Sequence, residues 1–257
     1  MQHQATGQSA TDGVVIVTGG SKGIGRQYCL DLAKRGYRVV VADIAGPGAV
    51  AAEITENGGN ALGIEADVTS ENDSRMMAET VVDEWGSITA LVNNAGYFTS
   101  IAKTPFDELT PKDWQMAFDV NVMGTWLCCK AVYPYMKKRR YGKIVNTSSM
   151  TVPTGVPGFL HYVSSKAAIV GLTRALAREL GEHGIAVNTI SPCYIPHDEG
   201  YSSRQDPAMG TALMNERAFK REMVPQDLVG TLHYLVSRDS DFVTGQNLFV
   251  NGGRVFT

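Results

Sequence analysis

The feature that most constrains the fold is an alternation, from Gly13 onward, of short Val/Ile/Ala-rich runs with longer segments of helical period. Short apolar runs are typical of parallel strands buried on both faces, and the periodic segments are typical of crossover helices. Strands are expected at Val14–Val17, Arg38–Ala42, Ala61–Glu65, Ala90–Val92, Gly142–Asn146, Ile185–Ile190 and Asn247–Val250. Helices are expected at Gly25–Arg35, Ala49–Asn57, Glu71–Glu84, Pro111–Lys138, His161–Gly181 and Gln226–Ser237. The pattern predicts an α/β fold, a single doubly wound domain with a parallel seven-stranded sheet and helices on both faces.

Two stretches stand outside this pattern. Residues 1–12 are polar and aperiodic, so we expect a disordered N-terminal tail before a single domain over residues 13–257. Ser191–Gly210 is rich in Pro, Gly and Ser and is long for a connection in a compact domain, which favours a substrate loop near residues 191–225.

Charge and composition exclude several classes of function. Lys and Arg number 23 against 26 Asp and Glu, a net charge of −3, so there is no basic excess for binding a nucleic acid or an anionic membrane. No long apolar run or signal-peptide stretch occurs, and a cytoplasmic location is expected. The Cys and His residues lack metal-ligand spacing, so no metal site is expected and the four cysteines are interpreted as free thiols.

A glycine-rich turn, TGGSKGIG over Thr18–Gly25, follows the first expected strand and opens a helix at Ile24. Gly19 can adopt backbone angles closed to other residues, Gly23 lets a pyrophosphate approach, and Gly25 permits close helix–strand contact. Backbone N–H groups at the helix start would then face the phosphates of a dinucleotide. The candidate cofactor-binding residues here are Gly19, Ser21, Lys22, Gly23, Ile24 and Gly25.

Asp43 ends the second expected strand, about 20 residues after the glycines. A carboxylate there accepts hydrogen bonds from both ribose hydroxyls of an adenosine and repels a 2′-phosphate. Lys22 argues the other way, because a cation in the turn could pair with that phosphate. We give the acid more weight, since a phosphate against a carboxylate is a direct like-charge clash, and predict NAD as the cofactor.

Tyr162 and Lys166 are separated by one turn at the start of a helical pattern, so their side chains share a face. An ammonium beside a phenol favours the phenolate and lowers a pKa that is about 10 when unperturbed. The pair is therefore a candidate for proton transfer. The alternative is a buried Tyr and a solvated Lys at an ordinary helical spacing.

These motifs, with three further segments, resemble the short-chain dehydrogenase/reductase family in order and spacing over nearly the whole chain. The further segments are Asn93–Gly96, Asn121 and Ser149. The resemblance implies a Rossmann fold and a proton relay in which Tyr162 is the general acid/base and Lys166 lowers its pKa and binds the nicotinamide ribose. Ser149 would hold the substrate oxygen, and Asn121 would hold a water linking Lys166 to solvent.

The resemblance also extends the cofactor site. Asp67 and Val68 would meet the adenine, and the Asn93–Gly96 segment would line the ribose or steady its strand. The residues added in this way are Ile44, Asp67, Val68, Asn93, Ala95, Gly96, Pro192 and Ile195. Two positions depart from the family pattern, because Cys193 stands where Gly is usual and His197 where Thr would bond the carboxamide.

The substrate is expected to be a small molecule with a hydrophobic or aromatic ketone or secondary alcohol, held by an aromatic-walled pocket. The candidate substrate residues are Ser149, Met150, His161, Tyr162 and Tyr194. By resemblance, the assembly is a homotetramer. The sequence thus predicts an NAD-dependent oxidoreductase that interconverts a secondary alcohol and its ketone by hydride transfer. Alternatives are an NADP-dependent carbonyl reductase of the 3-oxoacyl type, suggested by Lys22, and an inactive dinucleotide-sensing protein, suggested by Cys193 and His197.

Overall fold

The computed structural model describes residues 13–98, 101, 103–195 and 207–256, so the expected tail over residues 1–12 lies outside the described part. Seven strands form one sheet, ordered β3-β2-β1-β4-β5-β6-β7, with every neighbouring pair parallel. The strands are β1 Val14–Thr18, β2 Arg38–Asp43, β3 Asn60–Glu65, β4 Ala90–Asn93, β5 Gly142–Thr147, β6 Ile185–Pro192 and β7 Asn247–Val250. The strand order reverses between β1 and β4, the place where a crevice opens at the carboxyl ends of the strands. The predicted fold class is confirmed.

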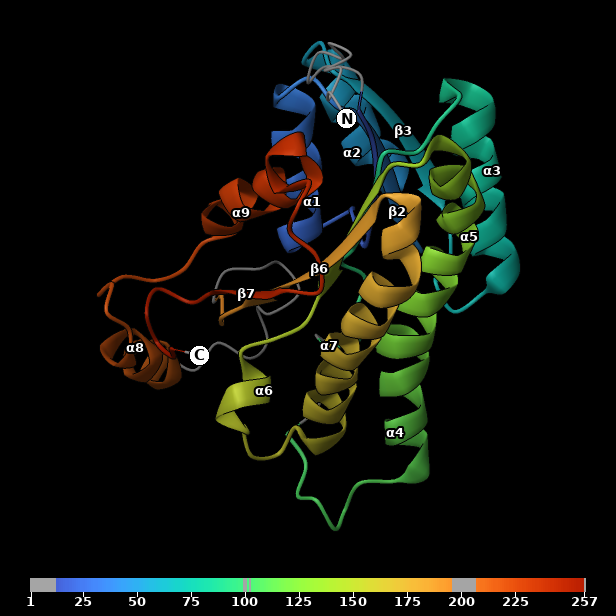
Figure 1. Ribbon diagram of the computed structural model, residues 1–257. Coiled ribbons are helices and arrows are strands. Elements are labelled where there is room, and N and C mark those ends of the chain that lie inside the picture. Colours follow the sequence, from blue (N-terminus) through green and yellow to red (C-terminus); the bar gives the residue numbers. More distant parts are fainter. Residues whose placement is uncertain (1–12, 99–100, 102, 196–206, 257) are drawn as a thin grey trace.

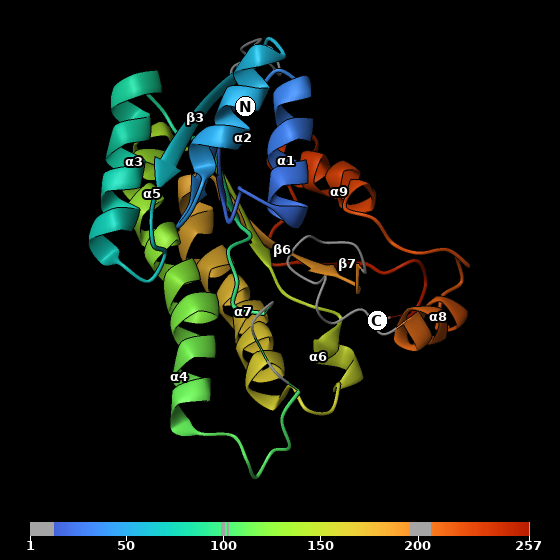
Figure 2. The same cartoon turned by 180° about the vertical axis from the view of Figure 1, so that it is seen from behind.

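Helices cover both faces of this sheet (Figures 1 and 2). The α-helices of the described part are α1 Gly23–Lys34, α2 Pro47–Glu56, α3 Glu71–Trp85, α4 Pro111–Phe118, α5 Gly124–Arg139, α6 Thr151–Thr154, α7 Leu160–Leu180, α8 Pro207–Glu216 and α9 Gln226–Val236. One apolar core lies between the sheet and α1, α2 and α9, and a second lies between the sheet and α3, α5 and α7. This two-sided cover explains why the central strands read as unbroken apolar runs.

Strand β1 contributes apolar side chains to both cores. Val15 and Val17 pack into the core under α1, whereas Val14 and Ile16 pack into the core under α3 and α5. Successive side chains of a strand point to opposite faces, so every residue of a central strand is buried. Each such side chain contributes roughly 1.5–3 kcal/mol through burial.

The single helix expected over Pro111–Lys138 is wrong. The segment forms α4 and α5 joined by a π-helical turn over Asp119–Met123. Asn121 lies in this π-helical turn and is buried. Its side chain hydrogen-bonds to Tyr97 and Ser165, which lie outside the turn. The helical period of apolar residues continues through the π-helical turn, so the sequence pattern could not reveal the turn. Turns of this kind are frequent at functional sites.

The connection after β6 contains more structure than expected. Helix α8 occupies Pro207–Glu216, within the segment predicted to be a substrate loop. Elsewhere, the short helix α6 follows β5. Residues 196–206, including His197, lie outside the described part. Among the helices of the described part, α7 is long enough to cross a membrane but none combines that length with sufficient hydropathy.

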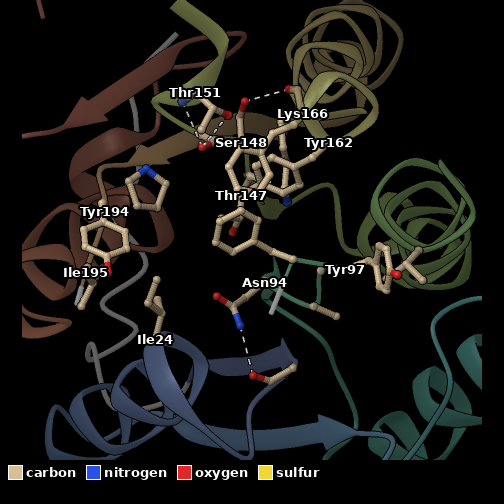
Figure 3. A pocket seen from close by; sticks show the side chains of 18 of the residues that line it. Ile24, Asn94, Tyr97, Thr147, Ser148, Thr151, Tyr162, Lys166, Tyr194 and Ile195 are labelled. Carbon is tan, nitrogen blue, oxygen red and sulfur yellow. Dashed lines mark hydrogen bonds between the residues drawn. The ribbon is translucent and has the colours of Figure 1, made fainter. Parts of the chain in front are cut away.

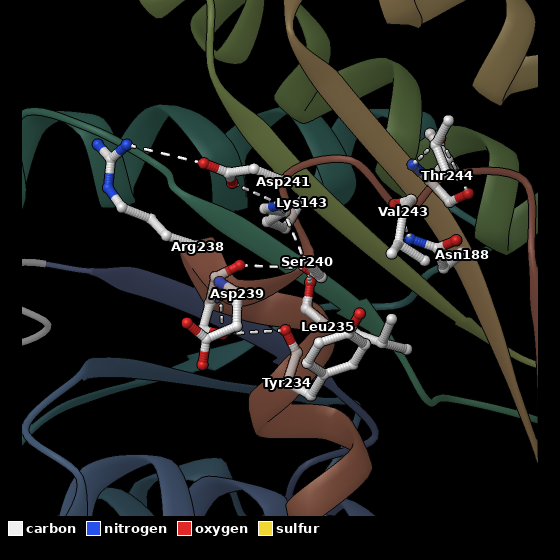
Figure 4. Close-up of polar contacts among 12 residues, drawn as sticks. Lys143, Asn188, Tyr234, Leu235, Arg238, Asp239, Ser240, Asp241, Val243 and Thr244 are labelled. Atoms are coloured by element: carbon white, nitrogen blue, oxygen red, sulfur yellow. Dashed lines mark hydrogen bonds and ion pairs between the residues drawn. The ribbon is translucent and has the colours of Figure 1, made fainter. Parts of the chain in front are cut away.

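A buried lysine anchors the end of the sheet opposite to the crevice (Figure 4). The Lys143 side chain on β5 is 2% exposed, and its Nζ lies 2.8 Å from Asp241 Oδ1 and 3.2 Å from Ser240 Oγ. The ammonium also lies 5.7 Å from the centroid of the Tyr141 ring. These contacts join β5 to the segment that follows α9.

Replacing Asp241 with Asn should lower the free energy of unfolding by about 2 kcal/mol, because the buried Lys143 ammonium loses its anionic partner. Urea unfolding followed by circular dichroism measures the change. Asp239→Asn removes a carboxylate from the same turn that does not pair with Lys143, so it is the control and should change stability by less than about 0.5 kcal/mol. Equal effects of the two substitutions would contradict this account of Lys143.

Candidate active site

The carboxyl ends of the strands surround one cavity of about 1540 Å³. Many of the predicted site residues line it: Gly19, Ser21, Lys22, Ile24, Asp43, Ile44, Asp67, Val68, Ala95, Gly96, Ser149, Met150, Tyr162, Lys166, Pro192, Tyr194 and Ile195. Figure 3 shows Tyr162 and Lys166 on one side of this cavity, Tyr194 and Ile195 on another, and Ile24 and Asn94 toward the first strand and helix. The predicted residues that do not line it are Gly23, Gly25, Asn93, Asn121 and His161.

Three glycines of the turn have a backbone conformation or a packing that disfavours a side chain. Gly19 has a φ of +65° and Gly23 a φ of +55°, in the left-handed region that favours glycine. A Cβ on Gly25 would collide with the Gly19 carbonyl oxygen and with the Asn94 side-chain amide. The Asn94 Nδ2 in turn donates to the carbonyl oxygens of Thr18 and Gly19, at 3.2 and 3.1 Å. The start of α1 is therefore held close to the end of β4.

The acidic end of β2 fits the ribose of a dinucleotide. Asp43 Oδ2 accepts a hydrogen bond of 3.0 Å from the Ser21 backbone N–H, which fixes the carboxylate beside the turn. The Ser21 hydroxyl is buried and has no hydrogen-bond partner among the described residues. A buried polar atom without a partner is costly, and a ligand hydroxyl or phosphate would satisfy it. Lys22 also lines the cavity, with an exposed side chain.

Asn93 does not line the cavity and steadies its strand, which is the second of the two roles expected for its segment. Its side chain is 3% exposed and donates to Asn146 Oδ1 at 2.9 Å and to Cys129 Sγ at 3.3 Å, so it braces β4 against β5 and α5. Its neighbour Asn94, which the sequence analysis passed over, holds the glycine turn instead. Strand alternation was the available signal, because adjacent residues at a strand end point to opposite faces.

Ser149, Tyr162 and Lys166 converge at one end of the cavity, and each is less than 10% exposed. The Tyr162 hydroxyl is hydrogen-bonded to Ser149, and Ser149 Oγ also accepts from the Thr151 backbone N–H at 3.1 Å. The neighbouring Ser148 is engaged elsewhere, since its hydroxyl donates to the Lys166 carbonyl at 2.7 Å. The structure thus places the Ser149 hydroxyl, and not that of Ser148, against the phenol.

The expected effect of Lys166 on Tyr162 needs correction. Burial raises the pKa of the Tyr162 phenol to about 12, and the hydrogen bond with Ser149 offsets only part of this. Burial likewise lowers the pKa of the Lys166 ammonium to about 8. The Lys166 Nζ donates to the Thr147 carbonyl at 2.9 Å and lies 5.9 Å from the centroid of the Tyr162 ring. Burial is therefore the largest influence on the pKa values of both side chains.

Asn121 lies behind the cavity wall. Its Oδ1 accepts from the Tyr97 backbone N–H at 2.8 Å, and its Nδ2 donates to Ser165 Oγ at 2.9 Å. A Cβ placed on Gly96 would lie 3.2 Å from Asn121 Oδ1 and 3.4 Å from Lys166 Nζ. The structure thus brings Asn121 and Lys166 to the same glycine, and Asn121 fixes the backbone beside Lys166.

His161 is not a substrate residue in this structure. Its side chain is 2% exposed and faces α4, where the Asp113 charge raises a pKa that burial lowers more strongly. Helical geometry accounts for this, because adjacent residues on a helix point about 100° apart and Tyr162 already faces the cavity. Phe98 and Phe159 line the cavity instead, and the Phe98 ring centroid lies 4.5 Å from that of Tyr162.

The cavity also has a cation near the C-terminal end of the described residues, and no metal site was found among those residues. Arg254, which no sequence motif marked, lines the cavity from the C-terminal turn. Among the described residues, no group of three His, Cys, Asp or Glu side chains is arranged to hold a metal ion.

Comparison with known proteins gives consistent matches. Residues 19–254 match the family model described as enoyl-(acyl carrier protein) reductase. A 3-oxoacyl-[acyl-carrier-protein] reductase from Synechocystis is 34% identical over 246 residues, covering 94% of this chain and 96% of that one. The BbsD subunit of (2S)-[(R)-hydroxy(phenyl)methyl]succinyl-CoA dehydrogenase from Thauera aromatica is 37% identical, covering 94% and 96%.

A solved structure has the same fold over its whole length. It is a 7α-hydroxysteroid dehydrogenase in complex with NADH and 7-oxo glycochenodeoxycholic acid, with a TM-score of 0.89 and 31% identity, covering 96% of this chain and 98% of that one. The glycine turn, the Ser149–Tyr162–Lys166 cluster and these full-length matches agree, and the chain belongs to the short-chain dehydrogenase/reductase family of oxidoreductases.

Proposed function

We propose that this protein is an NAD-dependent oxidoreductase that interconverts a ketone and the corresponding secondary alcohol. The observation that carries the choice of cofactor is the hydrogen bond from the Ser21 N–H to the Asp43 carboxylate. This bond holds a negative charge where an adenosine ribose would lie, and a 2′-phosphate at that position would be repelled.

The cluster of Ser149, Tyr162 and Lys166 would carry the proton chemistry. A bound nicotinamide dinucleotide supplies or accepts the hydride. For ketone reduction, Ser149 would donate a hydrogen bond to the carbonyl oxygen, and Tyr162 would transfer its phenolic proton to that oxygen. The raised pKa of Tyr162 keeps the phenol protonated at neutral pH, as a proton donor requires. Lys166 would bind the ribose through its ammonium.

A second candidate is an NADP-dependent reductase of 3-oxoacyl thioesters. Several matched relatives are named 3-oxoacyl-[acyl-carrier-protein] reductases, and Lys22 lines the cavity close to the expected ribose position.

The aromatic side chains Phe98, Phe159 and Tyr194 favour a ketone with an apolar body over a small polar one.

A spectrophotometric screen at 340 nm tests the proposal. Purified protein is assayed with NADH and NADPH against cyclic, aryl and 3-oxoacyl ketones, the last as N-acetylcysteamine thioesters. We expect NADH to support turnover with a kcat/KM about 100-fold above that with NADPH. A preference for NADPH with a 3-oxoacyl thioester would establish the second candidate. Tight NADH binding without turnover of any ketone would favour the dinucleotide-sensing alternative.

We also propose a homotetramer. By the family resemblance, one interface would be formed by β7 and α9, and another by the helices of Pro111–Lys138 and His161–Gly181. In this second interface, α5, α7 and the π-helical turn before α5 carry the large exposed apolar side chains Met123, Trp126 and Leu160. Light scattering coupled to size-exclusion chromatography should give about four times the chain mass, and replacing Trp126 with Glu should lower that mass. A monomer at micromolar concentration would contradict the proposal.

A further inference from the structure

We propose that the substrate carries a carboxylate and that the Arg254 guanidinium binds it at the end of the cavity beyond Ser149 and Tyr162. This inference rests on the proposed ketone–alcohol chemistry and names the substrate class that it acts on. Arg254 lines the same cavity as Ser149, Tyr162 and Lys166, and the proposed mechanism does not use its charge.

The chain builds a turn that puts Arg254 at this end of the cavity. After β7, the Asn251 Oδ1 accepts from the backbone N–H groups of Gly253 at 2.8 Å and Arg254 at 3.2 Å. The Cys193 N–H donates to the Val250 carbonyl at 3.1 Å, which holds the end of β7 beside the end of β6. Arg254 therefore emerges at the carboxyl edge of the sheet, next to the segment that the family resemblance places at the nicotinamide.

The same asparagine links this turn to the catalytic cluster. Asn251 Nδ2 donates to the Val255 carbonyl at 2.9 Å and contacts Met150 Sδ at 3.5 Å. Met150 adjoins Ser149 and lines the cavity. The position of Arg254 is thus fixed relative to the residue expected to hold the substrate oxygen.

The guanidinium is oriented but has a strong acceptor on one side only. Its Nε donates to Glu216 Oε2 at 2.7 Å, and the Arg254 side chain is 13% exposed. The Cys193 thiol also interacts with the guanidinium, but a thiol is a weak acceptor, and Cys193 Sγ already accepts from Arg217 Nη2 at 3.5 Å. A carboxylate is a much stronger partner, and a planar guanidinium fixed through Nε presents its terminal N–H groups for bidentate binding.

Apart from the Glu216 carboxylate, which already pairs with Arg254 Nε, the acidic side chains that line the cavity come from other segments. At this end the cavity is lined by Met150, Tyr194 and Leu213, whereas Asp43 and Asp67 lie at the dinucleotide end, after β2 and β3. Asp119 lines the cavity from the π-helical turn near α4. Charge attraction is strengthened where apolar side chains exclude water. Lys103 also lines the cavity, but its side chain is exposed, so its charge is better screened.

The kinetic test compares matched pairs of ketones, 4-oxopentanoate, 5-oxohexanoate and 6-oxoheptanoate, each with its methyl ester. We expect the wild-type protein to favour the acid at least 10-fold in kcat/KM for one chain length. Arg254→Met should lower kcat/KM for that acid 30-fold or more, mainly through KM, and change the ester less than threefold. Arg254→Lys should retain part of the activity with the acid, because lysine keeps the positive charge but lacks the two parallel N–H donors of the guanidinium.

Two variants separate binding from tethering. Glu216→Gln replaces the ion pair between α8 and the C-terminal turn with a neutral hydrogen bond but keeps the Arg254 charge, so the preference for the acid should persist. Lys103→Met removes an exposed cation of the cavity lining that the proposed mechanism does not use, and it should change the preference less than threefold. If Glu216→Gln abolishes the preference as completely as Arg254→Met, Arg254 only tethers α8 to the C-terminal turn. If Lys103→Met abolishes it, Lys103 and not Arg254 binds the carboxylate.

A binding test decides the inference even if no ketone is turned over. The thermal shift of the NADH-loaded protein is measured with hexanoate and with hexanamide. Hexanoate should raise Tm more than hexanamide, and the difference should disappear in Arg254→Met. Equal shifts in the wild-type protein, or a wild-type preference for methyl esters over acids, would overturn the inference. Absence of turnover with all ketones, but with the hexanoate shift intact, would count against the proposed function alone.

Discussion

Tyr162→Phe should lower kcat for ketone reduction by about 1,000-fold, because the substituted ring has no proton to give to the carbonyl oxygen. The phenol hydroxyl is hydrogen-bonded to Ser149, and its ring packs against Phe98, so removing one oxygen leaves the packing in place. Steady-state rates at 340 nm with saturating cofactor measure the loss.

Cofactor binding provides the control for Tyr162→Phe. NADH affinity, followed by fluorescence titration, should change less than threefold, since the glycine turn and Asp43 are untouched. Ser148→Ala is the matched variant, because its hydroxyl bonds to the Lys166 carbonyl and not to the phenol. It should retain at least a tenth of the activity. Residual activity of more than about one part in ten for Tyr162→Phe would remove Tyr162 from its assigned role.

The pKa values predict different pH profiles for the two directions. Burial raises the pKa of Tyr162 to about 12, so the protonated phenol that reduction needs is present throughout the neutral range. Alcohol oxidation needs the phenolate, whose population increases with pH. The kcat/KM for oxidation should therefore rise from pH 6 to pH 9, whereas that for reduction should stay constant between pH 6 and pH 7.5. A reduction rate that falls across pH 6 to 7.5 would indicate a different proton donor.

Asp43→Ser should raise the ratio of kcat/KM with NADPH to kcat/KM with NADH by about 100-fold. Removing the carboxylate abolishes a like-charge clash with the 2′-phosphate, and a gain of about 3 kcal/mol corresponds to roughly that factor. The serine hydroxyl can still accept from the Ser21 N–H, which limits disturbance of the turn. Kinetics with both cofactors at one ketone concentration measure the ratio.

The matched variant for Asp43→Ser is Asp67→Ser. Asp67 lines the same end of the cavity, but its carboxylate accepts from the Thr69 backbone and hydroxyl within its own turn. Its substitution should change the cofactor ratio less than fivefold. A wild-type preference for NADPH, or an unchanged ratio in Asp43→Ser, would show that Lys22 and not Asp43 decides the choice of cofactor.

Local pattern was sufficient to locate the strands of the sheet and the side chains of Tyr162 and Lys166 that line the cavity. A strand buried on both faces needs an unbroken apolar run, so Val14–Val17 and Arg38–Ala42 could be located without knowing their neighbours. The spacing of Tyr162 and Lys166 places both side chains on one helix face, whatever packs against it. The turn at Gly19 requires a left-handed backbone, which the sequence marks with glycine.

Only the tertiary structure decided which neighbours these side chains meet. Asn93 and His161 belong to the right segments, yet they face Asn146 and α4, because packing across the sheet and between helices sets their direction. The π-helical turn at Asn121 depends on bonds to Tyr97 and Ser165 from distant segments. Arg254 reaches the cavity through a turn whose geometry Asn251 fixes. The sequence by itself determined the fold and the shared helix face of Tyr162 and Lys166, because both follow from local periodicity, whereas the pKa values of these side chains and the place of Arg254 depend on burial by segments far apart in the chain.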